Sequence, residues 1–195
     1  MQAFFLNSLC FFKKLNDYVL LSHHKFEIMY PINYFLFLLV ALVPIVLGYA
    51  WYHPNIFGKI WQSEAKIVQE HISNFGIKQF MLLYILSFLF AFSLQFSVIH
   101  QYHIISILSE EVGFMDQTGA AYKDYIYFFE KYGTSFRTFK HGFLHGFLHG
   151  LFICLSIIGI VSIFERKSWK YVLIHSGFWI FVSALMGGLI CQFNG

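Results

Sequence analysis

Four long runs of apolar residues dominate the hydrophobicity pattern of the chain. They cover residues 34–52, 80–99, 143–164 and 171–193, and none has Asp, Glu, Lys or Arg in its interior. Each run is close to the ~20 residues that a helix needs to cross a bilayer. The pattern therefore predicts an all-α fold, a transmembrane four-helix bundle, with residues 29–195 forming a single membrane domain.

Prolines predict where the first of these helices bends and where it ends. Pro44 lies near the middle of the run and frees a backbone carbonyl, so we expect a kink there. Trp51 and Tyr52 are typical of the membrane–water interface, and Pro54 follows them as a helix terminator. The turn at residues 165–169 is short enough to predict that the last two helices are antiparallel neighbours.

The connections between the runs predict short interfacial helices. Residues 63–75 place apolar side chains at helical spacing after Ser63, a suitable N-cap. Residues 121–133 combine aromatic and charged side chains at helical spacing as well. The apolar pattern of the second run continues to Gly113, which predicts a helix that extends beyond the bilayer.

The composition agrees with a membrane protein and argues against other classes. Of the 195 residues, 58% are hydrophobic and 12% are charged, whereas a soluble domain of this size needs more charge on its surface. The net charge of +3 is small and scattered, so no nucleic-acid partner is expected. The connection between the first two runs and the turn between the last two carry a small excess of basic residues, which predicts that they face the cytoplasm. The basic residues are Lys59, Lys66, Lys78, Arg166, Lys167 and Lys170.

Residues 1–28 differ from the rest of the chain. They lack the basic start and the small-residue cleavage site of a signal peptide. We therefore expect an extension outside the membrane domain, with translation beginning naturally at Met29 or with residues 1–28 dispensable. The cysteines, Cys10, Cys154 and Cys191, are isolated, which argues against a disulfide framework and a thiolate metal site.

The third run begins with the repeat HGFLHGFLHG at residues 141–150. Glycines at every fourth position let a neighbouring helix backbone approach closely, which stabilises helix pairs in membranes. This spacing predicts a packing surface formed by Gly142, Gly146 and Gly150. Gly187 and Gly188 in the last run predict a second close helix contact.

The histidines of the same repeat form a strip beside the glycines. Imidazoles are costly against lipid, so they should face the bundle interior or a wet cavity. His100 and His103 end the second run on the same membrane face, which predicts a polar or metal-binding cluster of His100, His103, His141, His145 and His149. The alternatives are interhelical hydrogen bonds or a haem. We expect His145 or His149 to meet a polar group of another helix, with His100 as the first choice.

A second candidate pair lies at the other membrane face, where His53 ends the first helix and His175 lies one turn into the last. They can meet across the bundle, or each can be an ordinary interfacial histidine. No carboxylate lies within a run, which argues against carboxylate proton relays. Phosphate-binding loops and a G-x-S-x-G elbow are missing from the sequence as well.

Several motifs together resemble the DUF1761 family of small bacterial integral membrane proteins. The residues that carry this resemblance are Trp51, Pro54, Phe57, Gly58, Trp61, Trp169, Gly177 and Trp179. The KHGxxHG sequence at residues 140–146 is similar to the Bacteroidetes-like branch of the family. His175 stands where the family is expected to have an asparagine. The resemblance implies a multi-pass protein of the bacterial inner membrane and brings no activity with it.

These observations predict a non-enzymatic accessory or assembly component of the membrane without a cofactor. The alternative is a redox or transport protein that binds a metal ion or a haem through the membrane-embedded histidines. The expected partners are the lipid bilayer and either a second copy of the chain or another membrane protein.

Overall fold

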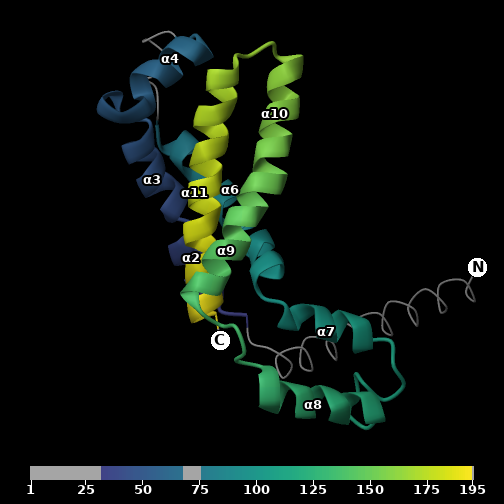
Figure 1. The fold of residues 1–195 in the computed structure, drawn as a ribbon. Coiled ribbons are helices and arrows are strands. Elements are labelled where there is room, and N and C mark those ends of the chain that lie inside the picture. The colour runs from purple at the N-terminus through teal and green to yellow at the C-terminus, as the bar shows by residue number, and fades with distance from the viewer. Residues whose placement is uncertain (1–31, 68–75, 195) are drawn as a thin grey trace, which may run out of the picture. The chain divides into compact units, whose positions relative to one another are not determined.

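The computed structural model describes residues 32–67 and 76–194, and within these ranges every regular element is a helix. The all-α prediction is therefore confirmed. The described residues fall into two compact units, residues 33–100 with 134–194 and residues 101–133. The elements of Figure 1 are α2 (Tyr34–Val40), α3 (Val43–Trp51), η1 (Pro54–Gly58), α4 (Lys59–Ala65), α6 (Ile77–Val98), α7 (Gln101–Leu108), α8 (Ala120–Tyr132), α9 (Phe139–His149), η2 (Gly150–Cys154), α10 (Leu155–Phe164) and α11 (Trp169–Phe193).

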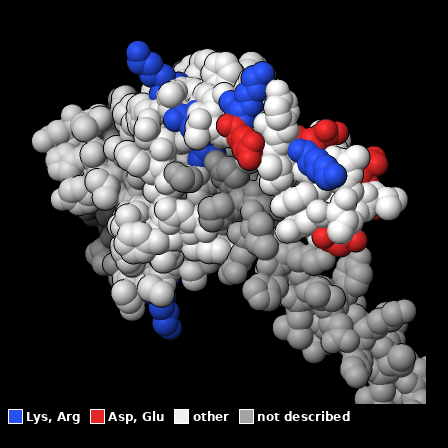
Figure 2. Space-filling view, turned by 90° about the horizontal axis from the view of Figure 1, so that it is seen from below, with Lys and Arg blue, Asp and Glu red and all other residues white. Residues whose placement is uncertain are grey.

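Four helical segments of the described chain are long and apolar enough to cross a membrane: Tyr34–Trp51, Ile77–Val98, Phe139–Phe164 and Trp169–Phe193. Their burial pattern is that of a membrane protein. Helix α6 buries the polar Ser87 and Gln95, whereas Leu82 and Leu86 on the same helix are more than half exposed. Figure 2 shows a face on which basic and acidic side chains stand among a mostly uncharged described surface. The protein is a multi-pass membrane protein.

The first span is interrupted where the sequence predicts a kink. Helix α2 ends at Val40, and α3 begins at Val43 with Pro44 in its first turn. Proline is tolerated at this position because the first backbone N–H groups of a helix have no intrahelical partner. Helix α3 then ends at Trp51, as expected before Pro54.

The predicted extension of the second helix to Gly113 is wrong. Helix α6 ends at Val98, and Ile99 adopts an extended conformation with φ −117° and ψ 99°. Apolar residues do continue beyond this point, but they belong to α7 in the second unit. There Ile105, Phe114 and Tyr125 form a small core of their own with α8. Helix α8 matches the helix predicted for residues 121–133.

The prediction that a helix begins at Ser63 is also wrong. Ser63 lies near the end of α4, which closes at Lys66 in the left-handed conformation, with φ 55°. The π-helical turn η1 leads directly into α4, so the local helix begins earlier than the pattern indicates. Residues 68–75 and the predicted extension 1–28 lie outside the described residues.

Helix α11 is the centre of the membrane unit. It packs against α2, α3, α6, α9 and α10 (Figure 1). Half of the residues in its most hydrophobic stretch are buried. Its connection to α10, residues 165–168, makes these two helices antiparallel neighbours, as predicted. The polar caps of α11 are Ser168, whose hydroxyl accepts from the Tyr171 amide, and Asn194 at the C-terminal end.

The glycine strip of α9 lies directly on α11. A Cβ atom at Gly142 would lie 2.2 Å from the Gly187 carbonyl oxygen, and one at Gly146 would lie 2.1 Å from that of Ser183. A Cβ atom at Gly150 would likewise lie 2.5 Å from the Cα atom of Ile180. The packing surface expected from the glycine spacing is thus present, with backbone against backbone. Gly188 instead faces the ring of Phe139.

Arg137 fastens the segment before α9 to the C-terminal end of α11. Its Nε donates to the Cys191 carbonyl oxygen at 3.1 Å, and its Nη2 donates to the Asn194 carbonyl oxygen. Beside it, the Phe139 amide donates to the side chain of Gln192 at 2.9 Å. A cation here satisfies carbonyl groups that a helix end leaves without intrahelical partners.

The Arg137→Ala variant should lower the free energy of unfolding by about 1.5–3 kcal/mol, the usual contribution of hydrogen bonds to a charged group. Equilibrium unfolding in detergent measures this loss. Arg137→Lys keeps the charge without the two-pronged geometry and should recover part of the stability. The exposed Lys140 supplies the control, because Lys140→Ala should leave stability within about 0.5 kcal/mol. Equal effects of the two alanine substitutions would contradict the role assigned to Arg137.

Candidate functional site

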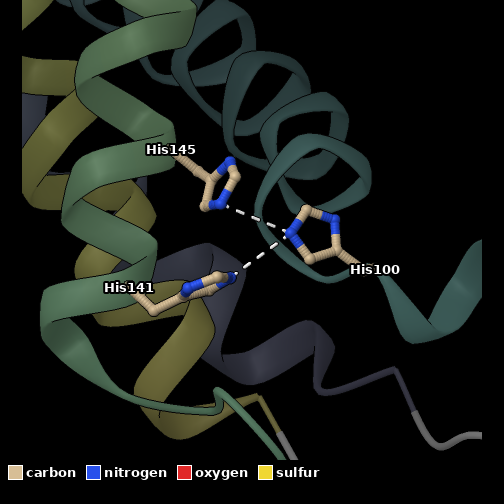
Figure 3. Close-up of side chains that lie close together, drawn as sticks. All are labelled: His100, His141 and His145. Atoms are coloured by element: carbon tan, nitrogen blue, oxygen red, sulfur yellow. Dashed lines mark hydrogen bonds between the residues drawn. The ribbon is translucent and has the colours of Figure 1, made fainter.

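Three histidine side chains meet at one end of the membrane unit (Figure 3). The Nε2 atom of His100 lies 3.4 Å from Nε2 of His145 and 3.3 Å from Nε2 of His141. One nitrogen from each of the three rings falls within 4.8 Å of the other two. We call this group the histidine triad. His100 is exposed, whereas His141 and His145 are half-buried.

Two local features of the backbone bring the triad together. Helix α9 presents His141 and His145 on one face, because residues four apart in a helix are neighbours. The turn after α6 brings in His100: the fully buried Ile99 ends the helix in an extended conformation immediately before it. The register of α9 is in turn fixed by its glycine contacts with α11. The site is therefore built on packed helices.

An aromatic side chain covers one member of the triad. The ring of Phe136 lies 5.3 Å from that of His141, with 34° between the planes. Phe136 has φ 60°, a left-handed conformation that is costly for a bulky residue. Its carbonyl oxygen accepts from the Thr138 amide at 2.9 Å and from the Cys191 thiol at 3.5 Å. These contacts hold the strained residue in place, and Thr138 caps α9 through the His141 amide.

The other two histidines of the predicted cluster lie elsewhere. Nδ1 of His149 forms a hydrogen bond of 3.1 Å with the Ser97 hydroxyl of α6, and its ring packs edge-on against Phe90. His103 lies on α7 in the second unit, where its carbonyl oxygen accepts from Ser106. The structure thus brings together three of the five residues, and the expected contact between His100 and His145 is present.

The second predicted pair does not form. His53 turns its Nδ1 to the backbone amide of Asn55, two residues on. His175 instead meets Tyr52, whose hydroxyl oxygen lies 2.9 Å from its Nδ1. Sequence reasoning assigned Tyr52 only an anchoring role at the interface. Its position next to His53 in the sequence was the signal that could have included it.

The sequence comparisons identify the family. The family described as "Protein of unknown function (DUF1761)" matches residues 36–191, which is most of the chain. The chain belongs to the DUF1761 family. No curated protein and no solved structure matches it.

The residues that carry the DUF1761 resemblance hold the connection after α3 against α11. The indole nitrogen of Trp51 donates to the Ile174 carbonyl oxygen at 3.2 Å, and its ring packs on Phe57 at 4.6 Å. Gly177 leaves room for this indole, because a Cβ there would lie 3.4 Å from the Trp51 ring. Gly58 is required because a Cβ would lie 2.3 Å from the Tyr52 carbonyl oxygen. These DUF1761 residues therefore act in packing.

The remaining residues of this resemblance have separate positions. Pro54 begins η1, and Trp61 packs on the Tyr52 ring at 4.9 Å. Trp179 contacts Phe90 of α6 at 5.1 Å. Trp169 is 70% exposed at the start of α11, as expected for an interfacial anchor. None of these positions in the DUF1761 chain contributes to the histidine triad.

Proposed function

We propose that this DUF1761 protein binds one divalent transition-metal ion through His100, His141 and His145. The observation that carries the proposal is the spacing of the Nε2 atoms. Two nitrogen ligands at about 2.0–2.1 Å from a tetrahedral ion lie about 3.3–3.4 Å apart. The Nε2 atom of His100 lies 3.3 Å from Nε2 of His141 and 3.4 Å from Nε2 of His145. The ligand nitrogens of His141 and His145 lie within 4.8 Å of each other, and bound metal would draw them closer together.

The donor type supports ions such as Zn²⁺, Cu²⁺, Ni²⁺ or Co²⁺. Imidazole suits these ions, whereas Mg²⁺ and Ca²⁺ prefer oxygen ligands. Three protein ligands leave a fourth position for water or an exchangeable ligand, the arrangement of open zinc sites. The exposure of His100 supports access from outside the bundle. A haem between two axial imidazoles fits less well, because its ligand nitrogens lie about 4 Å apart on opposite faces of the macrocycle.

In this proposal the protein is a metal-binding component of the membrane with no reaction of its own, in the inner membrane of a bacterium. The ion links the C-terminal end of α6 to the start of α9. Its role is to hold or exchange metal at the membrane surface.

The test is metal titration of the purified protein in detergent, with any affinity tag removed. A chromophoric chelator competing for Zn²⁺ should report one site per chain, and Co²⁺ should give the visible absorption bands of a nitrogen-ligated ion. Losing even a hydrogen-bond partner of a ligand typically costs about 10–100-fold in affinity. His145→Ala removes a ligand, so it should weaken Zn²⁺ binding by about 100-fold or more.

His103→Ala and His53→Ala are the matched controls, because each removes a histidine outside the triad. Both should bind Zn²⁺ as the parent protein does. If His145→Ala binds with unchanged affinity, or if the controls lose binding equally, the triad is not the metal site.

A further inference from the structure

A large cavity lies at the other end of the membrane unit from the histidine triad. Its volume is about 830 Å³, within the range of small-molecule sites. Residues of α3, α4, α6 and α11 line it together with the connection at residues 52–54. Gln79 and Leu83 at the start of α6 belong to its wall, whereas His100 follows the end of that helix.

The break in the first span creates this space. Pro44 and Ile45 at the start of α3 are among the lining residues. Gly48 on the next turn of α3 approaches Phe178 of α11, where a Cβ would be in ordinary contact at 3.7 Å. Helix α2 packs on both α6 and α11, whereas beyond the break α3 is held mainly by α11. The interval between α3 and α6 is therefore lined by side chains and left open.

The lining is aromatic and carries no charged Lys, Arg, Asp or Glu side chain among the residues described. Six aromatic rings contribute to it: Tyr49, Tyr52, His53, Trp61, Phe178 and Trp179. Phospholipid head groups carry charges, and desolvating a charge without a partner is costly. The cavity thus favours a neutral occupant that has flat surfaces and enters from the lipid phase.

Tyr52 on one wall belongs to a half-buried polar pair. The Tyr52 hydroxyl forms its 2.9 Å hydrogen bond with Nδ1 of His175. Nε2 of His175 is buried and has no hydrogen-bond partner among the described residues. When Nδ1 carries the imidazole proton it donates to the Tyr52 oxygen, which leaves the phenol hydrogen for an acceptor in the cavity. Burial raises the pKa of Tyr52 above its usual value, and the nearby Tyr171 adds to this effect, so the phenol remains a donor.

We infer that this cavity binds a lipid-soluble quinone, with a head-group carbonyl accepting from Tyr52 and the ring lying among the aromatic side chains. A quinone is neutral, planar and apolar, and it presents a carbonyl acceptor to the Tyr52 hydroxyl on the wall. The apolar tail then leaves between α3 and α6 toward the lipid, where Val46 and Leu82 are exposed. This inference does not depend on metal binding at the histidine triad.

The experiment uses decylubiquinone as the probe and the tryptophan fluorescence of the full chain in detergent as the readout. Trp61 and Trp179 line the cavity, and Trp51 and Trp169 do not, so bound quinone should quench part of the emission saturably. Tyr52→Phe keeps the ring but removes the donor, and it should weaken binding about tenfold, the loss expected for one hydrogen bond.

A cavity-filling pair of variants separates binding in the cavity from partition into detergent. Leu83→Phe places extra volume in the cavity and should abolish saturable quenching, whereas Leu89→Phe at an exposed position of the same helix, outside the lining, should not. Dodecanol supplies the apolar control. Equal competition by dodecanol, non-saturable quenching, or unchanged binding in Leu83→Phe would each overturn the quinone inference.

Discussion

Replacing Gly146 by leucine should destabilise the membrane unit by about 3 kcal/mol or more, at the upper end of the usual cost of overpacking. The reason is that the new side chain meets backbone. A Cβ at this position would lie 2.1 Å from the Ser183 carbonyl oxygen and 2.8 Å from the Ser183 carbonyl carbon. Neither atom can rotate away as a flexible side chain can. Even Gly146→Ala should therefore be clearly destabilising, with leucine worse than alanine.

Gly159 provides the control for this prediction within the same membrane span. A Cβ at Gly159 has nothing within 4 Å, so Gly159→Leu should change the free energy of unfolding by no more than about 0.5 kcal/mol. Both variants add the same apolar side chain, so differences in expression or detergent binding are matched. Equal stability of the two leucine variants in detergent unfolding would show that α9 does not pack on α11 through its glycines.

Most of the fold follows from simple sequence patterns. The runs without charged residues set the four spans, because a bilayer requires about 20 apolar residues per helix and satisfied backbone groups throughout. The glycine spacing in α9 predicts a tight helix contact, since only a side chain of one hydrogen lets the Ser183 carbonyl approach. Pro44 predicts the interruption between α2 and α3.

Other features depend on tertiary packing and leave little local signal. The extended residue Ile99 lies within a continuous apolar pattern, and burial of its side chain decides where α6 ends. The π-helical turn η2 follows His149 without proline to mark it. The partner of His175 is Tyr52, because the packing of the chain after α3 on α11 brings the Tyr52 hydroxyl to 2.9 Å from the imidazole Nδ1.

The candidate site could be predicted from the sequence only in part, because it too depends on tertiary packing. Helical spacing places His141, His145 and His149 on one face, which is enough to predict a cluster. Spacing alone does not separate the first two from His149, whose ring turns to Ser97. The choice between His100 and His103 depends on the turn at Ile99. After this turn His100 still belongs to the membrane unit, whereas His103 lies on α7, which belongs to the other unit.

Zinc should stabilise the protein, and the triad should account for the whole effect. An ion that binds only the folded state adds RT ln(1 + [L]/Kd) to stability, which is about 2.7 kcal/mol at a free concentration of 100 Kd. The ion joins His100, which follows α6, to His141 and His145 on α9, so binding requires these helix ends to be assembled. The midpoint of unfolding in detergent should therefore rise with free Zn²⁺, and above Kd it should keep rising with the logarithm of the free concentration.

The matched comparison is between His145→Ala and His103→Ala at the same free Zn²⁺. The first should lose the metal-dependent rise, and the second should keep it, although each protein carries one histidine fewer. Imidazole binds metal only in its neutral form, so protons compete with zinc and the rise should shrink as the solution is made acidic. A rise of equal size in both variants would mean that zinc acts through other groups. No rise in the parent protein at saturating zinc would refute metal binding by the triad, because a site that joins two helix ends cannot bind tightly without stabilising them.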